Sequence, residues 1–152
     1  MPKNVDLFFI TLSSPLLIGV YENNKLIDSI VSEEKSSDVL PRIVQEMLEK
    51  YTIDGLFYLN GPGSFMAIKI AYIFLKSISI LKNIPLFASD AFNFNENSPI
   101  KAIGKLYFVR IGSEIKTQKL EIVSSVDFRL PSVLKYSEFN KQNAPMYGIG
   151  AV

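Results

Sequence analysis

Three apolar runs open the chain, at residues 6–12, 15–21 and 25–32, and short polar steps at 13–14 and 23–24 separate them. Apolar runs of this length bounded by turn residues predict β-strands. Asn23 and Asn24 tolerate the left-handed backbone angles that a two-residue hairpin requires, so the second and third strands are expected to pair directly. The pattern therefore predicts a three-stranded antiparallel meander.

The pattern changes to a helical period after residue 35. Ser36 or Ser37 is expected to cap a helix that runs to about Tyr51, with charged and polar side chains opposite its apolar stripe. One face of this helix is therefore expected to be buried and the other to be wet. The apolar stripe consists of Val39, Leu40, Ile43, Val44, Met47 and Leu48.

A second helix is predicted over residues 65–82, between short strands at 55–59 and 86–88. Its polar residues form only a narrow ribbon, and the remaining surface is more apolar than one sheet face can cover. Either a second layer of the same chain or another protein must bury the rest. For a chain of this length we expect a partner, because an exposed apolar stripe usually marks an interaction surface. The narrow ribbon of polar residues on this helix consists of Lys69, Tyr72, Lys76 and Ser79.

The order of meander, helix, strand, helix and strand predicts an α/β fold. Residues 93–99 are polar and end in proline, so we place a linker there and divide the chain into domains 1–98 and 99–152. Beyond the linker, strands are predicted at 103–111 and 115–124 around a Gly-Ser turn, and a last short strand is predicted within 145–152.

Composition narrows the chemistry that this chain can perform. The 152 residues are 48% hydrophobic, which is enough for one substantial core. The sequence has no cysteine and no histidine, so disulfides, zinc-thiolate sites, imidazole ligands and Ser-His or Cys-His nucleophile pairs are excluded. We expect no metal site and no cofactor. The first residues lack the apolar run of a secretory signal, so a cytoplasmic protein is expected.

Charge is unevenly distributed although the net charge is only +1. Residues 1–98 hold eight basic and eleven acidic side chains, net −3, whereas residues 99–152 hold eight basic and four acidic, net +4. The second part could face an anion such as tRNA, or its lysines could simply be solvated and protect strand edges. The basic residues of this second part are Lys101, Lys105, Lys116 and Lys119.

The apolar stretch 65–81 is interrupted by two lysines, so no membrane span is predicted.

A glycine-rich turn joins the strand at 55–59 to the second helix. Gly61 and Gly63 permit close approach of the backbone, and Ser64 can cap the helix. Such a turn at a helix amino terminus suits a phosphate, and Lys69 one turn further on could reach an anion. The same geometry also serves tight packing, and the spacing alone leaves both interpretations open.

The turn resembles the motif Gly-Pro-Gly-Ser-Phe-Thr-Gly-Ile-Arg-Ile-Gly of the TsaB (YeaZ) family, and residues 9–15, 35–41 and 83–86 are similar to three other family segments. The resemblance covers about residues 5–95. It implies an RNase H-like fold of the actin and sugar-kinase type, with a mixed sheet and here a shortened second subdomain. The matching residues in the turn are Gly61-Pro62-Gly63-Ser64-Phe65.

The resemblance also implies a function. Family members are non-catalytic cytoplasmic subunits of the bacterial machinery that makes threonylcarbamoyladenosine beside the tRNA anticodon. The two helices would dock on the homologous catalytic subunit TsaD or on a second copy, the ATPase TsaE would join the pair, and tRNA would be contacted only indirectly. The expected interface residues are Val39, Ile43, Met47, Met66, Ile70, Ile73, Phe74, Ser77, Ile78 and Leu81.

Four positions depart from the family pattern. Thr11 stands where catalytic members of the superfamily carry a metal-binding aspartate, and a neutral hydroxyl cannot hold magnesium as a carboxylate does. Lys35 replaces a histidine, Met66 a threonine and Ala67 a glycine. The changes at 66 and 67 favour packing over phosphate binding. The alternative to a scaffold subunit is a small nucleotide- or phosphate-binding enzyme that uses the turn 61–64.

Overall fold

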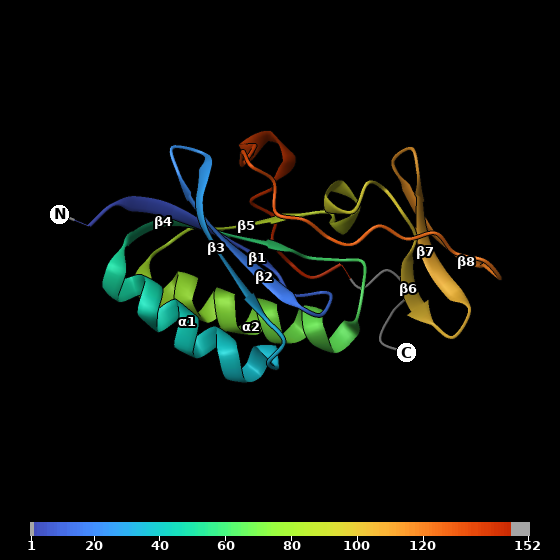
Figure 1. Ribbon diagram of the computed structural model, residues 1–152, viewed down its shortest axis with the longest axis horizontal. Helices are drawn as coiled ribbons and strands as arrows, with labels where there is room; N and C mark the ends of the chain where they lie inside the picture. The colour runs from blue at the N-terminus through green and yellow to red at the C-terminus, as the bar shows by residue number, and fades with distance from the viewer. Residues whose placement is uncertain (1, 147–152) are drawn as a thin grey trace.

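The structure, a computed structural model, describes residues 2–146 (Figure 1). Most of the last strand predicted from the sequence, at 145–152, lies outside the described residues. Five strands form the main sheet in the order β3-β2-β1-β4-β5. They are β1 Asn4–Ile10, β2 Leu16–Glu22, β3 Lys25–Ser32, β4 Thr52–Leu59 and β5 Leu86–Ser89.

The first three strands form the predicted antiparallel meander, and β4 and β5 extend the sheet in parallel with β1. Asn23 and Asn24 have φ angles of 50° and 67°. These left-handed values are those of a two-residue hairpin loop, so the predicted direct pairing of β2 with β3 is confirmed. β4 begins at residue 52, three residues before the predicted strand.

Helices α1 Ser36–Lys50 and α2 Phe65–Lys82 lie side by side on one face of this sheet (Figure 1). Ser64 caps α2 as predicted, because its Oγ accepts a hydrogen bond from the Ala67 amide at 3.4 Å. The predicted cap of α1 by Ser36 or Ser37 is wrong. The cap residue is Lys35, whose carbonyl accepts the amides of Asp38 and Val39, so both serines lie within the first turn.

The opposite face of the sheet carries a cluster rich in aromatic side chains. Phe8 packs against Phe94 with ring centroids 4.9 Å apart, and Phe57 packs against Phe139 at the same distance. Two segments cover this cluster: the 3₁₀ helix η1 Ala91–Phe94 and the irregular segment 125–146, which includes the short helix η2 Tyr136–Glu138. The central strands β1 and β4 are therefore buried on both sides, whereas most of the edge strand β3 is exposed.

Backbone hydrogen bonds attach the 125–146 segment to both edges of the main sheet. At the β5 edge, the Ala88 amide donates to the Asn140 carbonyl at 2.9 Å, and the reverse bond measures 2.7 Å. At the other edge, the Leu26 amide donates to the Ser132 carbonyl at 2.9 Å. A segment with no periodic pattern thus gains its order from the strands that it crosses, because it satisfies their open edges.

A buried carboxylate adds a side-chain attachment. The Tyr136 hydroxyl donates a hydrogen bond to Asp6 on β1, and the Tyr136 ring stacks on Phe57 with centroids 5.4 Å apart. Burial raises the pKa of Asp6, an effect that the hydrogen bond from Tyr136 opposes and nearby Asp54 adds to. Burial and the contact with Asp6 also raise the pKa of Tyr136. The phenol therefore keeps its proton and remains the donor at neutral pH.

A second, smaller sheet follows, with β6 Ile100–Ile103, β7 Leu106–Ile111 and β8 Glu114–Lys119 in antiparallel order. The sequence predicted two strands here, at 103–111 and 115–124, and that prediction is wrong in two respects. Gly104, with φ of 56°, forms a turn that separates β6 from β7, and the last strand ends at residue 119. The predicted linker at 93–99 is partly packed, since Phe94, Asn95 and Ser98 are buried whereas Asn93, Glu96 and Asn97 are exposed. The domain boundary at residue 98 stays a prediction.

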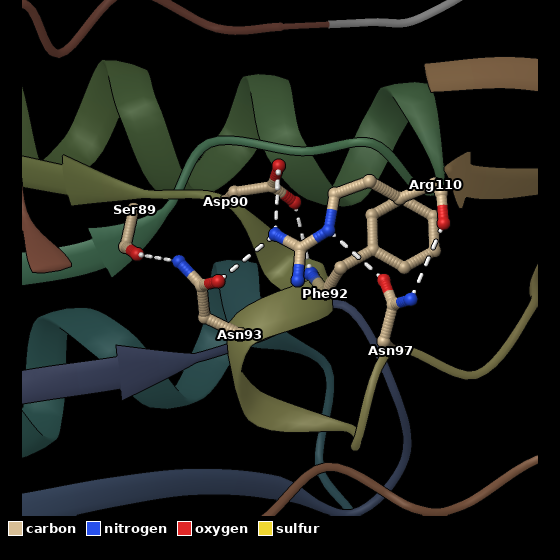
Figure 2. A network of polar contacts seen from close by, with 6 residues as sticks. All are labelled: Ser89, Asp90, Phe92, Asn93, Asn97 and Arg110. Carbon is tan, nitrogen blue, oxygen red and sulfur yellow. Dashed lines mark hydrogen bonds and ion pairs between the residues drawn. The ribbon is translucent and has the colours of Figure 1, made fainter. Parts of the chain in front are cut away.

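Arg110 on β7 joins the two parts of the molecule (Figure 2). Its Nη1 lies 3.4 Å from a carboxylate oxygen of Asp90 and donates to Asn93 Oδ1 at 2.9 Å. Its Nε donates to Asn97 Oδ1, also at 2.9 Å, and its guanidinium lies 5.4 Å from the centroid of the Phe92 ring. The planar group is thus held by several partners at once, which a lysine ammonium could not match.

Neither α1 nor α2, the α-helices of the described region, is long and apolar enough to cross a membrane.

We expect Arg110→Ala to lower the free energy of unfolding by about 2–3 kcal/mol, because it removes two charge-assisted hydrogen bonds and the contact with Phe92. Arg110→Lys should recover only part of the loss. Urea denaturation of both variants gives the values. Arg129→Ala is the matched control, since Arg129 is exposed and its side chain takes no part in this network. Equal losses for Arg110→Ala and Arg129→Ala would contradict the structural role of Arg110.

Candidate functional site

The outer side of α2 is an exposed apolar surface. The sheet covers only Ile68, Ala71 and Leu75 completely, while 53% of Ile73 and 70% of Ile80 remain accessible. This agrees with the expectation that one sheet face cannot cover the helix. We call this surface the α2 face, and it consists of Met66, Ile70, Ile73, Ser77, Ile80 and Leu81.

An apolar groove of about 350 Å³ lies between α2 and the first turns of α1. Ile70, Ile73 and Phe74 line it from the α2 side. Ser77 also lines it, but its hydroxyl donates to the Ile73 carbonyl at 2.7 Å and is thus already satisfied within the helix. The α1 wall of the groove consists of Ser36, Ser37 and Pro41.

The structure corrects the predicted interface on α1. Val39, Ile43 and Met47 are 0%, 3% and 6% exposed, because the apolar stripe of α1 faces the sheet. The prediction that these three side chains contact a partner is therefore wrong. Ile78 is half-buried and packs against the hydrophobic core that contains Val39, Ile43 and Met47. Conversely, Ile80 is highly exposed and was missed, although it lies seven residues, or about two helical turns, after Ile73.

Packing explains both glycines of the turn. Gly61 has φ of 126°, and a Cβ at this position would lie 1.8 Å from the Met146 carbonyl oxygen. The Met146 amide in turn donates to the Asn60 carbonyl at 2.6 Å. A Cβ at Gly63 would lie 3.3 Å from the Leu12 side chain. The turn is thus filled from both sides by the chain itself, as the packing interpretation of the sequence requires.

Ser64 nevertheless borders two shallow grooves. One, of about 300 Å³, also contains Thr11 and Lys35, with Glu33 and Glu34 at its wall. The other, of about 400 Å³, lies against the second sheet and is bordered by Gly63 and Asn95 among others.

The candidate phosphate residues do not all come together. Gly61, Gly63 and Ser64 lie in one turn, but Lys69 borders neither groove, and its ammonium lies 5.9 Å from the centroid of the Phe65 ring. Asn95 Oδ1 is buried without a hydrogen-bond donor, and a fully ionised phosphate group has no proton to donate to it. Within residues 2–146 no group of three acidic, histidine or cysteine side chains could hold a metal ion.

The basic residues of the second part are partly neutralised. Lys105 pairs with Glu121 at 2.7 Å, and Lys116 pairs with Glu114 at 3.6 Å. These ion pairs are exposed and contribute little to stability. They do, however, reduce the positive field that a tRNA-binding surface would need.

Comparison with known proteins supports the fold. No protein-family model and no curated protein matches the chain. Among solved structures, YeaZ from Pseudomonas aeruginosa is similar over 81% of this chain and 67% of its own, with a TM-score of 0.55 and 13% identity. The chain has the RNase H-like, actin-type fold of YeaZ.

A second solved structure is similar to the same degree. It is an uncharacterized protein with similarity to peptidase YeaZ from Pseudomonas aeruginosa, with a TM-score of 0.55 and 14% identity over 76% of this chain. The match spans 63% of that protein, which is less than two thirds of its length. At these identities the likeness concerns the fold.

We expect Gly61→Ala to lower the free energy of unfolding by roughly 3 kcal/mol, because the backbone angle is strained for any other residue and the new methyl group displaces Met146. Gly104→Ala is the control: its φ is also positive, but nothing lies within 4 Å of a Cβ there. We expect it to cost only about 1 kcal/mol. Chemical denaturation measures both. Similar losses at the two positions would contradict the packing interpretation of the turn.

Proposed function

We propose that this chain is a TsaB (YeaZ)-type protein, a non-catalytic subunit of the machinery that makes threonylcarbamoyladenosine in tRNA. In this role it docks on a TsaD-type catalytic subunit through the α2 face and the adjoining groove. The observation that carries the proposal is the apolar α2 face, which no other part of residues 2–146 covers. A TsaE-type ATPase joins the pair, tRNA is reached through the assembly, and the protein acts in the cytoplasm.

Two further observations support the family. The chain has the YeaZ fold, and the turn at 61–65 has the family's Gly-Pro-Gly-Ser-Phe sequence at the same junction of strand and helix. The fold alone is shared by many functions, so the motif adds what the fold cannot supply.

The chemistry of the chain supports a non-catalytic role. Thr11, which lines the same groove as Ser64, offers a neutral hydroxyl where a phosphate-transferring enzyme would need a carboxylate for magnesium. One similar structure is described as resembling a peptidase, but this chain has no histidine or cysteine for a Ser-His, Cys-His or zinc-histidine mechanism. The alternative, a nucleotide-binding enzyme built on the turn 61–64, has weaker support because Met146 and Leu12 fill that turn.

The docking surface can be tested by Ile73→Asp. We expect this variant to lose at least about 30-fold in affinity for the TsaD-type subunit of the same organism, since it places a charge in the middle of an apolar interface. Ile73 is 53% exposed, so the variant should remain folded. Light scattering on a sizing column detects the complex, and circular dichroism checks the fold.

Ile111→Asp is the matched control, because Ile111 is 64% exposed on β7 of the second sheet, away from α2. It should bind as the unchanged protein does. A folded Ile73→Asp variant that still binds normally would remove the α2 face from the proposal. Absence of any complex with the unchanged protein, with and without nucleotide and the TsaE-type subunit, would contradict the proposed function itself.

A further inference from the structure

Residues 140–146 pass from the edge of β5 to the end of β4, and we call this segment the latch. No side chain of the latch is fully buried. Hydrogen bonds therefore hold it in place, and a segment attached in this way opens locally at a lower free-energy cost than the core. The bonds join Asn140 to Ala88, Asn143 to Leu86 and Tyr58, and both Ala144 and Met146 to Asn60.

Three hydrogen bonds fix Asn60, which directly follows β4. Its amide donates to the Ser89 carbonyl at 3.2 Å, and its carbonyl accepts the Met146 amide at 2.6 Å. Its Nδ2 donates to the Ala144 carbonyl at 2.9 Å. Because the latch supplies two of the three partners, Asn60 is held fully only while the latch is closed.

Asn60 and Gly61 form the only Asn-Gly pair of the sequence. Asparagine is prone to deamidation before glycine, because no side chain shields the amide nitrogen that follows it. In this reaction the Gly61 nitrogen forms a bond to Cγ of Asn60, the Cγ–Nδ2 bond breaks, and ammonia leaves with the proton of the Gly61 amide. Water then opens the cyclic imide to give aspartate or isoaspartate.

The structure restrains one reactant of this step and leaves the other free. Within residues 2–146 the Gly61 amide donates no hydrogen bond, so the attacking nitrogen is not engaged elsewhere. Asn60 is engaged through its Nδ2 and through its backbone. Because a five-membered ring fixes the side-chain and backbone torsions of asparagine, its closure competes with the hydrogen bonds that the latch makes to Asn60.

We propose that Asn60 is a deamidation site, that the closed latch slows the reaction, and that the product keeps the latch from closing again. The aspartate product has a carboxylate oxygen in place of Nδ2, so it meets the Ala144 carbonyl as a second acceptor with no proton between them. Such an unmatched contact costs free energy, and the loss of ammonia makes the change one-way. This inference does not depend on the proposed function.

The test follows Asn60 in the full chain by mass spectrometry of the tryptic peptide 51–69, in which it is the only asparagine. We expect deamidation in the folded protein to be at least about tenfold slower than in guanidinium chloride, where no latch forms. The tryptic peptide 83–101 is the internal reference. It contains Asn97, whose side chain is held by Arg110 rather than by the latch.

Asn143→Ala loosens the latch without changing Asn60, because it removes the hydrogen bond from Nδ2 of Asn143 to the Leu86 carbonyl at 2.9 Å. We expect Asn60 to react about two- to tenfold faster in this variant, which is the effect of one net hydrogen bond on the open fraction. Gln142→Ala is the matched control, since Gln142 is an exposed residue of the same segment. It should react at the rate of the unchanged protein.

Asn60→Asp reproduces one product of the reaction. We expect hydrogen exchange to become faster at the amides of Asn140 and Met146 and to stay unchanged in α1. Asn97→Asp adds the same charge outside the contacts of the latch and is the control. Circular dichroism checks that the variants fold.

Three results would overturn the inference: equal deamidation of Asn60 in the folded and the unfolded chain, equal rates in Asn143→Ala and Gln142→Ala, or equal exchange of the latch in Asn60→Asp and Asn97→Asp. Faster deamidation of Asn97 together with Asn60 in Asn143→Ala would also contradict it, because that result indicates global unfolding. None of these measurements contains the TsaD-type subunit, so a failure here is distinguishable from a failure of the proposed function.

Discussion

The main sheet is apolar on both faces, and the rest of the structure follows from the need to cover it. Six of the seven residues of β1 are buried, so this central strand meets protein on each side. Burying apolar side chains is the dominant favourable term in folding, and a sheet buried on two faces requires a three-layer arrangement. The helices α1 and α2 supply one outer layer. The aromatic cluster and the 125–146 segment supply the other.

The two outer layers meet this need in different ways. On one face, two helices satisfy their own backbone hydrogen bonds and need only present apolar stripes to the sheet. On the other, the 125–146 segment has no such internal pattern, so the edges of β3 and β5 and the contact of Tyr136 with Asp6 hold it in place. The second sheet is attached through the contacts of Arg110 and through Ile100 and Phe108, which are buried in the aromatic cluster. What remains is the outer side of α2, which no part of the described chain covers.

Much of the main domain could be predicted from the sequence because its signals are local. The asparagine hairpin, the cap by Ser64 and the bounds of α2 follow from residue preferences and spacing within a few positions. The split between β6 and β7 was missed because Gly104 was counted within a strand. The order of residues 125–146 depends on contacts with strands more than a hundred residues away, which no local pattern records.

The candidate site, too, could be predicted from the sequence only in part. An excess of apolar residues on α2 can be counted in the sequence, but the direction of the α1 stripe cannot, so Val39, Ile43 and Met47 were assigned to a partner although they face the sheet. The glycine turn was ambiguous for a similar reason. The positions of Met146 beside Gly61 and of Leu12 beside Gly63 distinguish packing from ligand binding there.

Hydrogen exchange measured on this chain, alone and with the TsaD-type subunit of the same organism, tests the central claim most directly. The account predicts that exchange slows on binding in residues 65–82 and in the first turns of α1, where the apolar groove lies, and stays unchanged in β6, β7 and β8. Slower exchange confined to the second sheet or to the turn 61–64, with α2 unaffected, would contradict docking through the α2 face.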